Sequence, residues 1–319
     1  MDILKQKIKL IYIPLLLITL PFIVGYTFIN WLFLIKLNLF DIDQDVVNFW
    51  LPLVLPLIPI LIWLRPRISL LKLNKKAGGM LVFYHLIALM AVAVPTMVAQ
   101  AYLEKATGNF QQLDSVHQIN TRKLTKYYQI KDFYLDKQNI SSYVTFDTTT
   151  IKKTYSHRYR SLNKQINKNK KNKTDMQVYI LLPFLASPKD TLSSYCATWL
   201  GIQFSKELDK KLSEEQMQES YQNFVLEIKK NLDSEKQLQF VYLERLENSQ
   251  DSRNFATAAA ENKKYKAATI NILVSQNEPF ANRTDGFLAW IFFSFFFLTS
   301  AWLVMVLIPK FEETELTEM

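Results

Sequence analysis

Four long runs of apolar residues are separated by more polar stretches along the chain. They cover residues 11–34, 46–64, 81–100 and 286–308, and none of them contains Asp, Glu, Lys or Arg. A helix needs about 20 apolar residues to cross a hydrocarbon core of about 30 Å. Because lipid offers no partner to backbone N–H and C=O groups, each run should be helical. The pattern therefore predicts a membrane protein with four transmembrane α-helices.

The polar stretch between the third and fourth runs shows a different pattern. Segments rich in β-branched and aromatic residues predict strands, and they lie at 127–135, 143–148, 177–185, 197–204, 239–246 and 267–274. We therefore divide the chain into three parts. These are a membrane region at 1–103, a folded domain at 104–285, and the last span with a short acidic tail at 286–319.

Two helices are expected inside the folded domain. Ser213 and Gln216 form a capping box at the start of the first, which we place at 214–232. Its apolar residues recur at helical spacing and make one face around Phe224. The second helix is predicted at 253–264. This order of strands and helices is typical of an α+β domain with one mixed sheet, on which the face around Phe224 should pack.

Lys and Arg flank the apolar runs unevenly, and this bias predicts orientation. With the N-terminus inside, the inner flanks hold Lys5, Lys7, Lys9, Arg65, Arg67, Lys72, Lys75, Lys76 and Lys310, and the outer flanks hold Lys36, Lys105 and Arg283. We expect a multi-pass protein of a bacterial inner membrane, with cytoplasmic termini and a periplasmic domain. No small-x-small cleavage site follows the first run, so we expect an anchor rather than a cleaved signal peptide.

The formal net charge of +9 is concentrated in one segment. Residues 152–173 are rich in Lys and Arg, contain no Asp or Glu, and have few large apolar residues, which is typical of a loop. Its lysines are candidates for contact with anionic lipid headgroups or other acidic envelope polymers, and a simply solvated loop is the alternative. The candidates are Lys164, Lys168, Lys170, Lys171 and Lys173. The expected location outside the cytoplasm disfavours nucleic acid as a partner.

Three prolines lie within the second apolar run. Pro52, Pro56 and Pro59 are four and three residues apart, so they share one face of the helix. Each removes a backbone donor and strains the preceding turn. They predict a kinked helix with a groove for packing against a partner. The alternative is ordinary tolerance of proline in a membrane helix, where neighbours satisfy the freed carbonyls.

The residues that common catalytic and cofactor sites require do not occur at the necessary spacings. The chain has one Cys, three His and six Gly, and these form no nucleophile elbow, dinucleotide turn, phosphate loop or zinc motif. Asp41, Asp43 and Asp45 begin like a calcium loop, but Val46 stands where such a loop needs glycine. We therefore predict no catalytic residue, no metal and no cofactor.

Several segments resemble the N-terminal extension of certain bacterial rhomboid-family intramembrane serine proteases. They are Asn48–Ile68, Ala93–Gly108, Thr125–Ile140, Gln239–Ser252, Asn277–Phe292 and Leu307–Glu312, in the same order along most of the chain. The rhomboid catalytic core has a G-x-S-G serine and a later membrane histidine, and neither is present here. The resemblance therefore implies an accessory module that presents or recognises membrane proteins, with no catalytic residue to carry over.

Three functional classes remain open from the sequence. The first is a non-enzymatic membrane protein whose outer domain binds another membrane or envelope protein, or an envelope component. The second is a component of a rhomboid-type protease system whose catalytic part lies in another chain. The third is an envelope hydrolase that uses a pair of carboxylates, which linear sequence does not single out.

Overall fold

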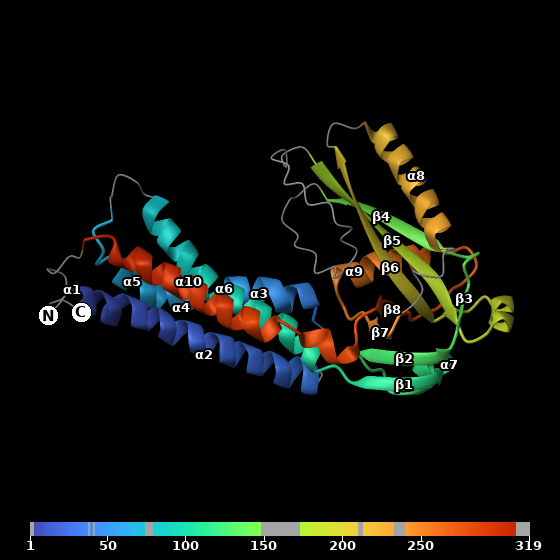
Figure 1. Ribbon diagram of the computed structural model, residues 1–319, viewed down its shortest axis with the longest axis horizontal. Coiled ribbons are helices and arrows are strands. Elements are labelled where there is room, and N and C mark those ends of the chain that lie inside the picture. Colours follow the sequence, from blue (N-terminus) through green and yellow to red (C-terminus); the bar gives the residue numbers. More distant parts are fainter. Residues whose placement is uncertain are drawn as a thin grey trace. The chain divides into compact units, whose positions relative to one another are not determined.

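The computed structural model describes residues 3–37, 39–40, 42–73, 79–147, 173–209, 213–232 and 240–310. The chain forms two compact units (Figure 1). The first, which we call the helical unit, comprises Met1–Gly108 and Pro279–Met319. The second, which we call the sheet domain, comprises Asn109–Glu278.

The described part of the helical unit contains four helices long and apolar enough to cross a membrane, and each overlaps one predicted run. The first consists of α1 (Ile3–Lys7), a π-helical turn (Ile8–Tyr12), α2 (Ile13–Asn30) and a second π-helical turn (Trp31–Lys36). The second consists of a π-helical turn (Val46–Trp50), α3 (Leu51–Val54), α4 (Leu57–Pro59), another π-helical turn (Ile60–Leu64) and α5 (Arg65–Ile68). The third is α6 (Gly79–Ala106), and the fourth joins a 3₁₀ turn (Phe280–Thr284) to α10 (Phe287–Leu307).

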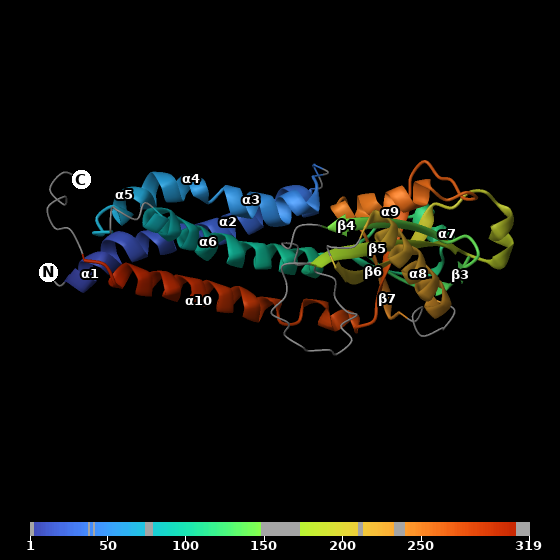
Figure 2. The ribbon, with the colours of Figure 1, turned by 90° about the horizontal axis from the view of Figure 1, so that it is seen from above.

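Helix α6 packs against each of the other three helices (Figure 2). Its Ala88 and Ala91 are fully buried, and small side chains of this kind let neighbouring helix backbones approach closely. Its Gln100 is also fully buried, donates to Thr27 Oγ1 at 3.0 Å and accepts from Asn30 Nδ2. These polar groups satisfy one another, which ties α2 to α6.

The carboxyl end of α10 is held by a lysine from the start of the chain. Lys7 is buried, and its Nζ donates to the backbone oxygens of Leu307 and Pro309. The last carbonyls of a helix have no partner within the helix and attract a cation. Tyr84 Oη also donates to Met305 O at 2.8 Å. Lys7 and Tyr84 therefore fix the end of α10 to the first and third helices.

The sheet domain contains one eight-stranded mixed sheet. Its strands are β1 (Phe110–Ser115), β2 (Tyr127–Asp132), β3 (Tyr134–Leu135), β4 (Ser141–Asp147), β5 (Lys173–Leu185), β6 (Thr198–Asp209), β7 (Tyr242–Arg245) and β8 (Asn271–Gln276). They run in the order β1-β2-β7-β8-β6-β5-β3, and β4 also pairs with β5. The pairs β1–β2 and β6–β8 are parallel, and the others are antiparallel. A mixed sheet was predicted, and the structure confirms it.

The two long helices of this domain cover opposite faces of the sheet (Figure 2). On β5, Val178, Ile180 and Leu182 face the cluster that includes α8 (Glu214–Leu232), while Tyr179 and Leu181 face the cluster with α9 (Gln250–Ala260). Successive strand residues point to opposite faces, so a continuous apolar run marks a strand that is buried on both sides. Burying one such large side chain contributes about 1.5–3 kcal/mol.

Helix α8 agrees with its prediction in bounds, cap and orientation. The Ser213 backbone N–H donates to Gln216 Oε1 at 3.0 Å, and the Gln216 backbone N–H donates to Ser213 Oγ at 3.3 Å. Phe224 packs on the sheet and meets Phe204 of β6 edge-to-face. The capping box and the apolar face at Phe224 are therefore confirmed.

Other elements differ from their predictions. Strand β1 and the short helix α7 (His117–Thr121) were not predicted, and α9 spans Gln250–Ala260 rather than 253–264. Strand β5 begins at Lys173 instead of 177, so it includes the last residue of the loop predicted at 152–173. A 3₁₀ turn (Pro188–Leu192) joins β5 to β6.

Candidate functional site

A bulge interrupts the edge of the sheet beside β5. Both β3 and β4 pair with the same strand, with Leu135 opposite Phe184 and Ser141 opposite Leu181. Residues 136–140 therefore stand opposite only Leu182 and Pro183. Extra residues of this kind leave the ladder and are frequent beside binding and active sites. The bulge is the place where polar side chains from distant parts of the chain come together.

Asp136 is the buried anchor of the bulge. Its carboxylate accepts hydrogen bonds from Tyr265 Oη at 2.7 Å, Asn139 Nδ2 at 2.7 Å and the Gln138 backbone N–H at 3.1 Å. Lys264 Nζ lies 3.6 Å from the same carboxylate. A buried carboxylate with this many donors is held in one position, and it holds the chain around it.

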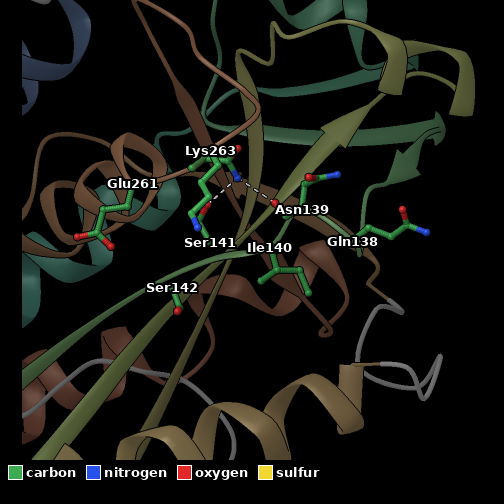
Figure 3. Close-up of a pocket in the computed structure, with 8 residues that line it drawn as sticks. Gln138, Asn139, Ile140, Ser141, Ser142, Glu261 and Lys263 are labelled. Atoms are coloured by element: carbon green, nitrogen blue, oxygen red, sulfur yellow. Dashed lines mark hydrogen bonds between the residues drawn. The ribbon is translucent and has the colours of Figure 1, made fainter.

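Asn262 connects the end of α9 to the bulge, and the dashed lines in Figure 3 mark its hydrogen bonds to Asn139 and Ser141. Its Nδ2 donates to Asn139 O at 2.9 Å and to Ser141 Oγ at 2.7 Å. Its Oδ1 accepts from the backbone N–H groups of Lys264 and Tyr265. One buried amide therefore uses both donors and its acceptor to join two segments that are far apart in sequence.

These segments line a shallow cavity of about 260 Å³ that is open to solvent on one side. Its lining is polar apart from one residue, and it consists of Gln138, Asn139, Ile140, Ser141, Ser142, Glu261, Asn262 and Lys263. Figure 3 shows Glu261 at one end of this group and Gln138 at the other. The volume is close to the lower end of the range of small-molecule pockets, so the cavity can take a side chain or a small polar group.

The rim and the floor of the cavity differ in their bonding. Ser141 and Asn262 are buried and hydrogen-bonded to each other, as described above. The side chains of Gln138, Glu261 and Lys263 are exposed, and none of them bonds to another residue within the described ranges. The floor is therefore rigid, while the rim offers an amide, a carboxylate and an ammonium group to a ligand.

The environment of Asp136 keeps it ionised. Burial alone would raise its pKa, but the hydrogen bonds from Tyr265, Asn139 and Gln138, together with the charge of Lys264, outweigh burial and hold the pKa of Asp136 below its usual range. Burial and the neighbouring carboxylate raise the pKa of Tyr265, so its hydroxyl stays a donor. This pair supports the structure and does not exchange protons near neutral pH.

The lowered pKa of Asp136 makes the sheet domain sensitive to acid. A carboxylate whose pKa is lower in the folded state contributes stability above its unfolded pKa, near 4, and this is lost as the pH falls through the folded value. We expect the urea midpoint of the wild-type domain to exceed that of Asp136→Asn at pH 6. The difference should shrink as the pH falls from 4 to 3. An equal difference at both ends of that range would contradict this assignment.

Cys196 is the one cysteine of the chain. The side chain is buried, and its Sγ donates to Thr198 O at 3.0 Å. Burial raises the pKa of Cys196 to about 11. A buried thiol with a raised pKa is unreactive.

We expect native Cys196 to resist thiol reagents. At pH 8 on the order of one thiol in a thousand is ionised when the pKa lies three units higher. The native protein should show no labelling by a maleimide within an hour, and full labelling in guanidinium chloride. The variant Leu192→Cys, at a residue that is 92% exposed, is the positive control. Rapid labelling of native wild-type protein would show that this part of the domain opens.

The prolines of the second helix lie partly inside the helical unit. Pro52 and Pro56 are buried and Pro59 is half-buried. The helix breaks into α3 and α4 at Leu55–Pro56, where Ile58 N bonds to Leu55 O at 3.2 Å. α3 packs against α6. The buried prolines thus belong to a kinked helix that contacts its own chain.

The predicted lysine cluster lies almost wholly outside the described residues. Residues 148–172 are not described, and they include Lys164, Lys168, Lys170 and Lys171. Lys173 is the first residue of β5, and the position of its side chain is not described. The described ranges contain no group of three or more His, Cys, Asp or Glu residues placed to hold a metal ion. Contact between the lysines and anionic groups stays a prediction.

Comparison with protein families, with curated proteins and with solved structures gives no match for this chain.

Proposed function

We propose that this chain is a non-enzymatic, multispan membrane protein whose sheet domain binds a protein partner at the outer face of a bacterial inner membrane. The observation that carries the proposal is the cavity at the sheet edge. Its floor is fixed by Asn262 and Asp136, and its rim side chains at Gln138, Glu261 and Lys263 face outward without an internal partner in the described ranges. A preformed polar site with exposed rim groups suits recognition.

The exposed faces of the helices support anchoring in lipid. On α10, Phe292, Phe293, Phe296 and Phe297 are each more than half exposed. A contiguous apolar surface of this kind is rare on a soluble monomer and is usual for a helix that faces hydrocarbon. The uneven distribution of Lys and Arg supports cytoplasmic termini and a periplasmic sheet domain.

A hydrolase with two carboxylates is less well supported than a binding protein. Such an enzyme needs two acids on the same cavity with pKa values that differ. Among the described lining residues Glu261 is the one acid, and Asp136 is already bonded to Tyr265 and Asn139. These contacts leave Asp136 occupied as a structural anion.

We further propose that the partner is a membrane protein of a rhomboid-type protease system. Two segments that carry the resemblance, 93–108 and 277–292, meet through Arg283, whose Nε donates to Lys105 O at 3.0 Å. The guanidinium carbon of Arg283 also lies 3.9 Å from the ring centre of Phe280. Two of the segments that resemble the rhomboid extension are therefore in contact, where the turn before α10 is hydrogen-bonded to the end of α6.

Affinity purification tests the proposed function. The full chain, expressed at native level and cross-linked before mild detergent extraction, should recover a companion protein in a constant ratio. The expected companion is a membrane or envelope protein, and a protein with a G-x-S-G membrane helix would favour the rhomboid-type system. A monodisperse monomer with no companion after cross-linking would contradict the proposal.

A further inference from the structure

Strand β4 is an outer strand of the sheet. Within the described residues it pairs only with β5, from Ser141 opposite Leu181 to Asp147 opposite Asp175. Its sequence, SSYVTFD, contains no Lys and no Pro, which commonly block the addition of a further strand at an edge. No described strand occupies the second edge of β4, so its main-chain groups can pair with an extended peptide.

The cavity lies where β4 begins. Ser141 is the first residue of β4 and Ser142 the second, and both line the cavity. A peptide that runs along the outer edge of β4 reaches the cavity at this end of the strand. The bulge at 136–140 departs from the regular ladder, so strand pairing ends there and a side chain of the peptide can enter the cavity.

The lining selects a polar side chain. Ile140 is the one apolar lining residue, whereas Glu261 suits a cationic group, Lys263 suits a carboxylate and Gln138 suits an amide. Figure 3 shows Glu261 and Gln138 at opposite ends, so the charged and amide groups are spread along the cavity. A sugar ring would more commonly meet an aromatic side chain, and the described lining contains none.

We infer that the outer edge of β4 and this cavity together bind an extended polar peptide segment of a protein partner. The peptide main chain adds as a strand beside β4, and one of its polar side chains occupies the cavity. This inference rests on the proposed function, because it names the part of the partner that the sheet domain recognises.

A peptide selection on the full chain in lipid nanodiscs tests the inference. The probe is a phage-displayed library of random twelve-residue peptides, and enriched sequences are synthesised with a fluorophore and titrated by anisotropy. We expect Gln138→Ala, and either Glu261→Gln or Lys263→Gln according to the charge of the enriched side chain, to weaken binding about tenfold or more. The matched controls Glu219→Gln and Lys189→Gln, also at exposed residues, should bind as wild type does.

A second arm tests strand addition without altering the protein. N-methylation of alternate backbone amides of the enriched peptide removes main-chain donors and keeps every side chain. We expect this change to abolish binding. The inference is overturned if the N-methylated peptide binds equally, or if none of the three cavity variants weakens binding.

Failure to enrich any peptide also overturns the inference, as does binding of N-acetylglucosamine oligomers alone. In that case a companion recovered in constant ratio by affinity purification would leave the proposed function standing. Failure of the peptide inference can therefore be distinguished from failure of the proposed function.

Discussion

Replacing Asn262 by Ala should lower the free energy of unfolding of the sheet domain by about 3–5 kcal/mol. The side chain donates hydrogen bonds to Asn139 O and Ser141 Oγ. It also accepts hydrogen bonds from the backbone N–H groups of Lys264 and Tyr265. Alanine leaves these buried groups without partners, and each unpaired buried group costs about 1–3 kcal/mol. The loss should exceed that of any substitution on the rim.

The sole cysteine supplies the measurement for Asn262→Ala. Full-length protein is incubated in a urea series and given a short pulse of maleimide, so that labelling of Cys196 reports unfolding of its domain. The midpoint should move to clearly lower urea, and peptides covering 136–147 should lose hydrogen-exchange protection. Asn277→Ala, at an exposed residue outside this network, should keep the wild-type midpoint. An unchanged midpoint for Asn262→Ala would mean that the network contributes little.

Replacing Gly201 by Val should destabilise the same domain by several kcal/mol, because the side chain has no room. A Cβ built at Gly201 lies 3.1 Å from Ile272 Cγ2 and 3.1 Å from two ring carbons of Phe255. These atoms belong to the packed layer between the sheet and α9, and overpacking such a core commonly costs about 1–3 kcal/mol. Valine adds two methyl groups beyond the Cβ and therefore costs more. The stability of Gly201→Ala should lie between those of wild type and Gly201→Val.

The test for Gly201 uses the same urea series with Cys196 labelling. Gly25 in α2 is the matched control, since a Cβ there meets nothing within 4 Å. Gly25→Ala should leave the midpoint of the sheet domain unchanged. A Gly201→Val protein with the wild-type midpoint would show that α9 can move away from the sheet at little cost.

The elements predicted from sequence are those with a strong local signal. The four apolar helices follow from length and composition, because runs such as 286–308 contain no charge. Helix α8 follows from the Ser213–Gln216 capping box and a regular apolar face. Both signals lie within one segment, so no knowledge of distant residues is needed.

Strand β1 could not be found in this way. Its sequence, FQQLDS, has one apolar residue at its centre, and only Leu113 is buried. The strand exists because β2 pairs with it in parallel, from Phe110 opposite Tyr127 onwards. Tertiary pairing overrides a weak local preference for strand in such a case.

The candidate site also depends on contacts between distant residues. Asn262 and Ser141 are 121 residues apart, and Tyr265 and Asp136 are 129 apart. In the sequence, Asp136 and Asn139 look like an ordinary polar turn between two strands. Nothing local distinguishes a buried, fully bonded Asp from an exposed one, so the bulge and its cavity required the fold.

The most direct measurement of the central claim is thiol labelling from outside the cell. Leu192→Cys and Ser69→Cys are each placed in a Cys196→Ser background, and both positions are exposed. Spheroplasts of a bacterial host are treated with a membrane-impermeant maleimide before and after permeabilisation. The account predicts that Leu192→Cys is labelled in intact spheroplasts and Ser69→Cys only after permeabilisation. Labelling in the reverse order, or recovery of the chain in the soluble fraction, would contradict it.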